Sequence, residues 1–133
     1  MSMDALFEAA REAQARAYAP YSGFKVGAAV QGESGTVYAG CNVENAAYPV
    51  GTCAEEAAIA AMIAAGEQRI TAILVLAGGQ KLVTPCGACR QRIREFGRAD
   101  TPIHAAGPES VRGTFQLEEL LPCAFGPDNV QPK

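Results

Sequence analysis

Three cysteines stand where two predicted helices begin. Cys53 opens the segment Cys53–Ala65, and Cys86 and Cys89 flank the start of the segment Gly87–Phe96. Cys86 and Cys89 are one helical turn apart, so both thiols can point at one metal ion. Helix starts carry partial positive charge and free N–H groups, which favour the thiolate form that binds metal. We therefore interpret the three cysteines as candidate ligands of one zinc ion.

A carboxylate accompanies the first of these cysteines. Glu55 follows Cys53 by two residues at the same predicted helix start, where it can lean over a metal without binding it. Three protein ligands leave the fourth zinc position open to water, and zinc lowers the pKa of that water toward neutrality. A carboxylate beside it can then take the proton. The alternative is that Glu55, like Glu56, only complements the helix dipole.

The pair Cys86 and Cys89 alone is a weak signal, because a redox pair or half of a structural zinc site has the same spacing. Cys41 and Cys123 are the candidates for a fourth ligand, although neither has a C-x-x-C partner. Otherwise we expect both to be plain buried thiols. His104 is the only histidine, and a lone histidine is more often structural than a ligand. The combination C-x-E, followed about thirty residues later by P-C-x-x-C, is typical of zinc deaminases that act on bases.

Composition narrows the class of protein. The chain has 133 residues, with 11 basic and 14 acidic side chains and a formal net charge of −3. This balance argues against a general nucleic-acid coat protein, which needs a basic face. Five cysteines form an odd count, which indicates free intracellular thiols rather than a disulfide framework. Residues 1–19 carry acidic side chains and do not fit a secretory signal, and no run is long enough to span a membrane, so we expect a cytoplasmic protein.

The elements that must position these residues follow from hydrophobic periodicity and turn signals. The expected helices are 3–18, Cys53–Ala65 and Gly87–Phe96, with Thr52 as a candidate N-cap and a helical turn at Leu117–Leu121. The expected strands are Lys25–Gln31, Thr36–Asn42, Ile70–Ala77, Ile103–Ala106 and Gly113–Gln116. Strands that alternate with helices predict one α/β domain over residues 1–133, with its sheet covered on both sides and a flexible tail from about residue 126.

Four segments, in this order and spacing, resemble the cytidine deaminase family in its short, homotetrameric, three-cysteine form. Tyr21–Ala29 (YSGFKVGAA) is similar to the family's first strand and the turn before it, and Gly40–Tyr48 (GCNVENAAY) to its ribose-binding segment. Thr52–Glu55 (TCAE) and Thr84–Gln91 (TPCGACRQ) are similar to its zinc motifs. The match runs from residue 19 to residue 125, which is most of the chain.

The resemblance implies a fold and a reaction. The fold is a three-layer α/β/α sandwich around a mixed five-stranded sheet. The reaction is the hydrolytic deamination of cytidine and 2′-deoxycytidine to uridine and 2′-deoxyuridine, with release of ammonia, in pyrimidine salvage. One zinc per subunit would be held by Cys53, Cys86 and Cys89, and Glu55 would be the proton shuttle. No organic cofactor is implied.

The resemblance also implies how the substrate is held. By this resemblance, Asn42 and Glu44 would bind the ribose hydroxyls. Phe24 would pack against the pyrimidine ring, and the backbone of Ala54 would meet the base. Tyr48 and Phe125 would reach across the subunit interface into a neighbour's site. Asn42 and Glu44 are two residues apart, so in an extended chain both face one side, where an amide and a carboxylate can satisfy a diol. A polar loop edge is the alternative for this pair, and core packing is the alternative for the two phenylalanines.

One position departs from the family pattern. The family usually has an arginine directly after the catalytic glutamate, and this chain has Glu56 there. Three thiolates and Zn²⁺ sum to a charge of −1, which a neighbouring arginine would offset by donating to the sulfurs. Glu56 cannot do this, so we expect it to point away from the metal. We expect Arg90 to replace the missing donor, with Arg92 or Arg94 as alternatives.

Three rival functions stay open at this point. Deaminases of the antibiotic blasticidin S share the zinc strings and also lack an arginine after the glutamate, although Asn42 and Glu44 favour a ribose diol. A nucleic-acid cytosine deaminase would need a positive channel, which the net charge disfavours. A zinc domain without enzymatic activity would need four ligands and would leave Glu55 without a task.

Overall fold

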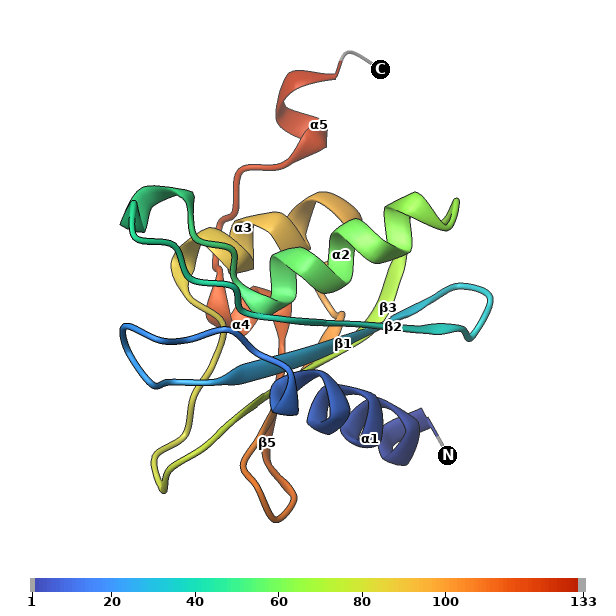
Figure 1. Ribbon diagram of the computed structural model, residues 1–133. Coiled ribbons are helices and arrows are strands. Elements are labelled where there is room, and N and C mark those ends of the chain that lie inside the picture. Colours follow the sequence, from blue (N-terminus) through green and yellow to red (C-terminus); the bar gives the residue numbers. More distant parts are fainter. Residues whose placement is uncertain (1, 132–133) are drawn as a thin grey trace.

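The computed structural model describes residues 2–131 and is organised around one mixed five-stranded sheet (Figure 1). Its strands are β1 (Val26–Gly32), β2 (Val37–Cys41), β3 (Ile70–Ala77), β4 (Pro102–Ala106) and β5 (Val111–Gln116). Their order across the sheet is β2-β1-β3-β4-β5. Only β3 and β4 are parallel, and the other neighbours are antiparallel. The prediction of an α/β fold with a mixed sheet is therefore confirmed.

Helices cover both faces of the sheet. They are α1 (Ser2–Ala15), α2 (Ala54–Ala64), α3 (Gly87–Phe96), α4 (Leu117–Leu120) and α5 (Pro127–Val130), with a 3₁₀ turn at Tyr48–Val50. Helix α1 packs below β1, β2 and β3, whereas α2 and α3 lie side by side above the sheet (Figure 1). This is the predicted three-layer α/β/α arrangement. None of the helices described here is both long and apolar enough to cross a membrane.

Strand β3 joins the two cores. Its sequence, ITAILVLA, is an unbroken apolar run, and almost all of it is buried. Successive side chains of a strand point to opposite faces. Accordingly Leu74 and Leu76 pack with α1, whereas Ile73 packs with α2 and α3. The prediction of a central strand buried on both faces is confirmed.

The start of α2 is placed by close packing against β2. A side chain at Gly40 would put its Cβ 2.5 Å from the backbone nitrogen of Ala58, so only glycine allows this approach. Helix α2 begins at Ala54, and its N-cap is Cys53 rather than the predicted Thr52. The backbone N–H of Cys53 donates to the Glu56 carboxylate at 3.4 Å, as in a capping box.

One predicted helix boundary was wrong, and the predicted tail contains a short helix. The first helix ends at Ala15 rather than at residue 18, because the backbone N–H of Tyr18 donates to Asn42 and the chain turns to follow that segment. The segment from about residue 126, which was predicted to be a flexible tail, contains helix α5. That helix is held by a bond from the Gly126 N–H to the Asn129 side chain at 2.8 Å and by an Arg94–Asp128 ion pair at 3.7 Å. Residues 132 and 133 of the predicted tail lie outside the described residues.

Candidate active site

The three predicted ligands meet at the starts of α2 and α3. Cys53 is the N-cap of α2, Cys86 is the N-cap of α3, and Cys89 lies in the first turn of α3. Their sulfur atoms all lie within 4.8 Å of one another. All three are free thiols; Cys89 is buried, Cys53 is half-buried and Cys86 is exposed. The packing of two helix starts on one sheet therefore brings together thiols that lie up to 36 positions apart in the sequence.

The cluster fits a zinc ion. Tetrahedral zinc with bonds of about 2.3 Å to sulfur holds its sulfur ligands roughly 3.8 Å apart, which is within the observed spacing. Thiolate ligands favour zinc over the harder magnesium and calcium ions. Burial raises the pKa of the Cys53 and Cys89 thiols, so a bound cation is what would hold them as thiolates.

The other cysteines and the histidine lie outside this cluster. The Nδ1 atom of His104 is 2.8 Å from the Thr114 hydroxyl on the neighbouring strand, as expected for a structural histidine. Cys41 is half-buried, and Cys123 is exposed with a φ of 53°. The expectation that Cys123 is buried was wrong, because it lies in the surface turn after α4. Among residues 2–131, a fourth metal ligand from either cysteine is not in place.

Glu55 is a buried carboxylate beside the thiols. It lies in the first turn of α2, is only 5% exposed and lines the same cavity as Cys53 and Cys86. Burial raises the pKa of Glu55, and the backbone N–H, Cys89 and the charge of Arg92 only partly oppose this shift. A carboxyl group with a raised pKa exchanges protons more readily near neutral pH than an ordinary glutamate does.

The arginine that touches a sulfur is Arg92, not Arg90 as expected from the sequence. Arg90 donates hydrogen bonds to the carbonyls of Pro85 and Leu120 and to the Thr84 hydroxyl, at 2.7 to 2.8 Å. Arg92 donates to the Cys89 sulfur at 3.4 Å. The physical reason is helical geometry: a residue one position after Cys89 is rotated by about 100°, whereas one three positions later lies on the same face. Arg92 was one of the two alternatives named from the sequence, but its helical spacing from Cys89 was not used to select it.

A cavity of about 390 Å³ opens from the thiols to the surface. Its lining includes most of the predicted substrate residues: Phe24, Asn42, Glu44, Tyr48 and Ala54. It also includes apolar residues that the sequence analysis did not single out: Val26, Val43, Val75 and Val83. A pocket with an apolar wall and a few polar groups is typical of a site for a small molecule.

The polar side chains of this cavity already have partners. The Asn42 amide donates to the Phe24 carbonyl at 2.8 Å and accepts from the Val26 N–H at 2.9 Å, so it fixes the wall on which Phe24 stands. The Glu44 carboxylate accepts from the Ser22 hydroxyl and from the backbone N–H groups of Tyr21 and Ser22. These bonds, that of the Ser22 hydroxyl first, lower the pKa of Glu44 and keep it ionised. Amide and carboxylate each retain free acceptor or donor capacity for a ligand.

The aromatic residues are the exposed part of the site. Phe24 is 44% exposed and Tyr48 is 74% exposed at the rim of the cavity. Phe125 is 60% exposed and is not among the cavity's lining residues; its carbonyl accepts from the Gln91 side chain at 2.8 Å, on the outer side of α3. All predicted site residues line this cavity except Cys89, Arg90 and Phe125. Cys89 adjoins it through its sulfur, which lies within 4.8 Å of those of Cys53 and Cys86.

The family model that matches this chain, and two relatives that match it, are described as cytidine deaminases. The family model described as "Cytidine and deoxycytidylate deaminase zinc-binding region" matches residues 1–105, which contain the three cysteines and Glu55. A cytidine deaminase of Sporosarcina psychrophila is 38% identical over 130 residues, covering 98% of this chain and 96% of the relative. A cytidine deaminase of Mycobacterium tuberculosis is 41% identical over 122 residues, covering 91% of this chain and 87% of the relative.

Solved structures are similar as well. The crystal structure of cytidine deaminase from Burkholderia pseudomallei matches with a TM-score of 0.87 and 43% identity, covering 94% of this chain and all of the other. That of cytidine deaminase from Mycobacterium tuberculosis matches with a TM-score of 0.79 and 41% identity, covering 92% and 96% of the two chains. Sequence and fold are therefore similar to the same class of enzyme over nearly the whole chain.

Proposed function

We propose, from the premise that this chain belongs to the cytidine and deoxycytidylate deaminase family, that it hydrolyses the 4-amino group of cytidine and 2′-deoxycytidine. The products are uridine or 2′-deoxyuridine and ammonia, and the general role is pyrimidine salvage. The observation that supports this most directly is the meeting of three free thiols and the buried Glu55 at one end of a nucleoside-sized cavity. A zinc domain without enzymatic activity would have no use for Glu55.

Cys53, Cys86 and Cys89 are the residues that would hold one zinc ion per subunit. When bound, zinc supplies a Lewis acid that activates water as a nucleophile. The chain's own contribution is to present three sulfurs from two helix starts and to leave the side facing the cavity open. The three-sulfur set needs no histidine, which agrees with the separate pairing of His104 with Thr114.

Glu55 is the proton carrier. Its carboxylate takes a proton from the attacking water and passes it to ring nitrogen N3, which makes carbon C4 electrophilic. The water oxygen bonds to C4, the bond from C4 to the amino nitrogen breaks, and Glu55 helps deliver the second proton so that ammonia leaves. The raised pKa of Glu55 suits a group that must both accept and donate in one cycle.

The nucleoside is held along the cavity. Phe24 would pack against the pyrimidine, the backbone of Ala54 would meet the base, and Asn42 and Glu44 would bind the ribose hydroxyls. The ionised Glu44 supports this assignment, since a carboxylate can accept a hydrogen bond from a sugar hydroxyl. The same feature disfavours blasticidin S, whose sugar does not offer an ordinary ribose diol.

The exposed aromatics support a shared site. We expect a homotetramer in which Tyr48 and Phe125 reach a neighbouring subunit's cavity, because both side chains are largely exposed in one chain. Large exposed aromatic side chains near a functional cavity are typical of surfaces that a partner covers. Free thiols further suggest a reducing cytoplasm, and the net charge of −3 favours a free nucleoside over nucleic acid.

A substrate panel with quantitation of bound metal tests the proposal. The panel contains cytidine, 2′-deoxycytidine, cytosine, blasticidin S and a short RNA. We expect about one zinc per chain, and ammonia release from cytidine and 2′-deoxycytidine only. Turnover of blasticidin S or of the RNA without turnover of cytidine would replace the proposed substrate, and a metal-free, inactive chain would overturn the zinc assignment.

A further inference from the structure

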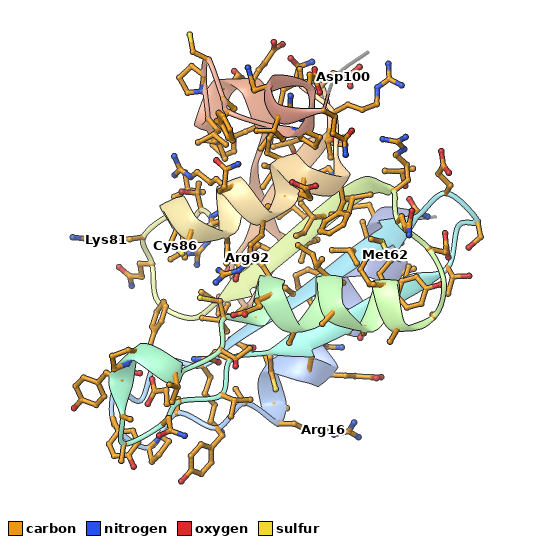
Figure 2. The ribbon with its side chains drawn as sticks, turned by 90° about the horizontal axis from the view of Figure 1, so that it is seen from above. Arg16, Met62, Lys81, Cys86, Arg92 and Asp100 are labelled. Atoms are coloured by element: carbon orange, nitrogen blue, oxygen red, sulfur yellow. The ribbon has the colours of Figure 1, made fainter. Side chains whose placement is uncertain are left out.

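Arg92 lies beside the thiols without being part of the deamination chemistry described above. It projects from α3 toward the start of α2, on the same side of the molecule as Cys86 (Figure 2). One of its nitrogens donates to the Cys89 sulfur at 3.4 Å, and another lies 3.6 Å from the Glu56 carboxylate. A guanidinium can serve both partners because its donors form a rigid planar fork.

The other arginines of α3 are engaged elsewhere. Arg90 is bound to two carbonyls and the Thr84 hydroxyl, and Arg94 pairs with Asp128 at 3.7 Å. On a helix, residues 90 and 94 share one side, whereas residue 92 lies on the side of Cys89. Within the described residues, Arg92 is thus the cation in hydrogen-bond contact with a thiol of the cluster.

Glu56 has two bonds that fix its position. Its carboxylate accepts from the backbone N–H of Cys53 at 3.4 Å and faces Arg92 from the first turn of α2. Through these two contacts Glu56 connects the helix start that carries Cys53 to the arginine that touches Cys89.

We propose that Arg92, positioned by Glu56, is the residue that offsets the negative charge of the three-thiolate site. Three thiolates and one Zn²⁺ leave a net charge of −1, and a hydrogen bond from a guanidinium withdraws electron density from one sulfur. The inference rests on the proposed function, because it assumes that zinc binds at the cluster. Arg92 is a positioning residue here, since it acts on the metal through Cys89 and does not touch the substrate.

Two readouts apart from turnover test this inference. The first is the resistance of bound zinc to a competing chelator, where Arg92→Met should weaken retention by about 10- to 100-fold. The second is the absorption spectrum of the cobalt(II)-substituted protein, where loss of the hydrogen bond raises the energy of the sulfur lone pairs. The sulfur-to-cobalt charge-transfer band of Arg92→Met should therefore move to longer wavelength.

The variants separate this role from a merely structural one. Arg92→Lys keeps the charge but not the fork, so we expect a smaller shift in both readouts. Glu56→Gln keeps an acceptor for the Cys53 N–H but loses the ion pair, and should shift both readouts in the same direction. If Glu56 acts through Arg92, the double variant should be no worse than Arg92→Met alone. Arg98→Met, just past the end of α3, is the matched control and should change neither readout.

The outcomes distinguish failure of the proposed function from failure of the proposed role of Arg92. If the unmodified chain binds neither zinc nor cobalt at the thiols, the proposed function fails. If it binds both, but Arg92→Met has an unchanged spectrum and unchanged zinc retention, this inference alone is overturned. A lower melting temperature with both readouts unchanged would mean that the Glu56–Arg92 pair only clamps α2 to α3.

Discussion

The end of the cavity where we propose that zinc binds, here the metal end, and the end where we propose that the nucleoside binds, here the nucleoside end, differ in how complete they are within one chain. At the metal end, Cys89 and Glu55 are buried, and Arg92 already contacts a sulfur. At the nucleoside end, Phe24 and Tyr48 are exposed on the rim, and Phe125 lies apart on the outer side of α3. The metal end rests on two helix starts packed on a sheet, whereas the nucleoside end rests on loops and on a segment near the C-terminus.

This difference predicts a division of labour. Helix starts fixed by a shared core can hold three ligands and a carboxylate in a set geometry without outside help. Exposed aromatics have little to hold them in place and gain burial only when a partner covers them. We therefore expect the metal chemistry to be self-contained in each chain, and the grip on the nucleoside to depend on assembly.

The largest expected effect tests the self-contained end. Glu55→Gln should keep its zinc, because the three thiols are untouched, but should lose about 10²- to 10⁴-fold in kcat, because amide cannot carry the proton. Steady-state kinetics and metal analysis check this. Glu12→Gln, exposed on α1 beyond the opposite face of the sheet, is the matched control. A near-normal kcat in Glu55→Gln would show that Glu55 is not the proton carrier.

A smaller effect tests the incomplete end. Phe125→Ala should lower kcat/KM by about 10- to 100-fold, the equivalent of the roughly 1.5 to 3 kcal/mol gained by burying such a side chain. Met3→Ala removes an exposed apolar side chain on α1 and should leave kcat/KM unchanged.

Mixing two defective chains sharpens the test of Phe125. Glu55→Gln chains can lend Phe125, and Phe125→Ala chains retain Glu55, so oligomers formed after mixing and reassociation should contain some complete sites. We expect the mixture to be more active than the sum of its parts. Strictly additive activity would mean that Phe125 does not reach a neighbouring site.

The smallest expected effect is on the pH dependence of stability, and it concerns His104, a buried side chain outside both ends of the cavity. Burial lowers the pKa of His104, so below about pH 6.5 the unfolded chain binds a proton that the folded chain resists. The free energy of unfolding should fall as the pH drops from 6.5 to the lowered pKa, by at most about 1.4 kcal/mol per pH unit. Urea unfolding of the metal-free chain between pH 8 and pH 5 measures this slope.

His104→Gln provides the comparison for that slope. Glutamine can still face Thr114 but does not titrate, so the variant should show a shallower loss of stability in acid. Identical slopes for the two chains would mean that His104 does not contribute to acid sensitivity.

The sequence accounted well for features that lie within one element. The burial of β3 on both faces follows from its unbroken apolar run, and α3 has the predicted bounds Gly87–Phe96. The ligand pair Cys86 and Cys89 follows from spacing along one helix. The helix end at Ala15 was misplaced because a tertiary bond from Tyr18 to Asn42 overrides the local helical pattern.

Relations between elements were harder to predict. The N–H groups of Tyr21 and Ser22 that hold Glu44 come from a turn more than twenty residues away, and no local pattern pairs them. The preference for Arg90 over Arg92 was an error of another kind. The helical spacing of Arg92 from Cys89 was visible, but adjacency in sequence was mistaken for adjacency on the helix surface.

The sequence by itself determined the chemistry of this protein: three thiols at helix starts, one carboxylate beside them, and a buried strand to support both. Only the tertiary structure decided which arginine meets the sulfur, how Glu44 is held, and that Phe125 stands outside its own chain's cavity. The physical reason is that spacing along a helix or strand fixes the direction of its own side chains, whereas contacts between elements depend on how their faces pack.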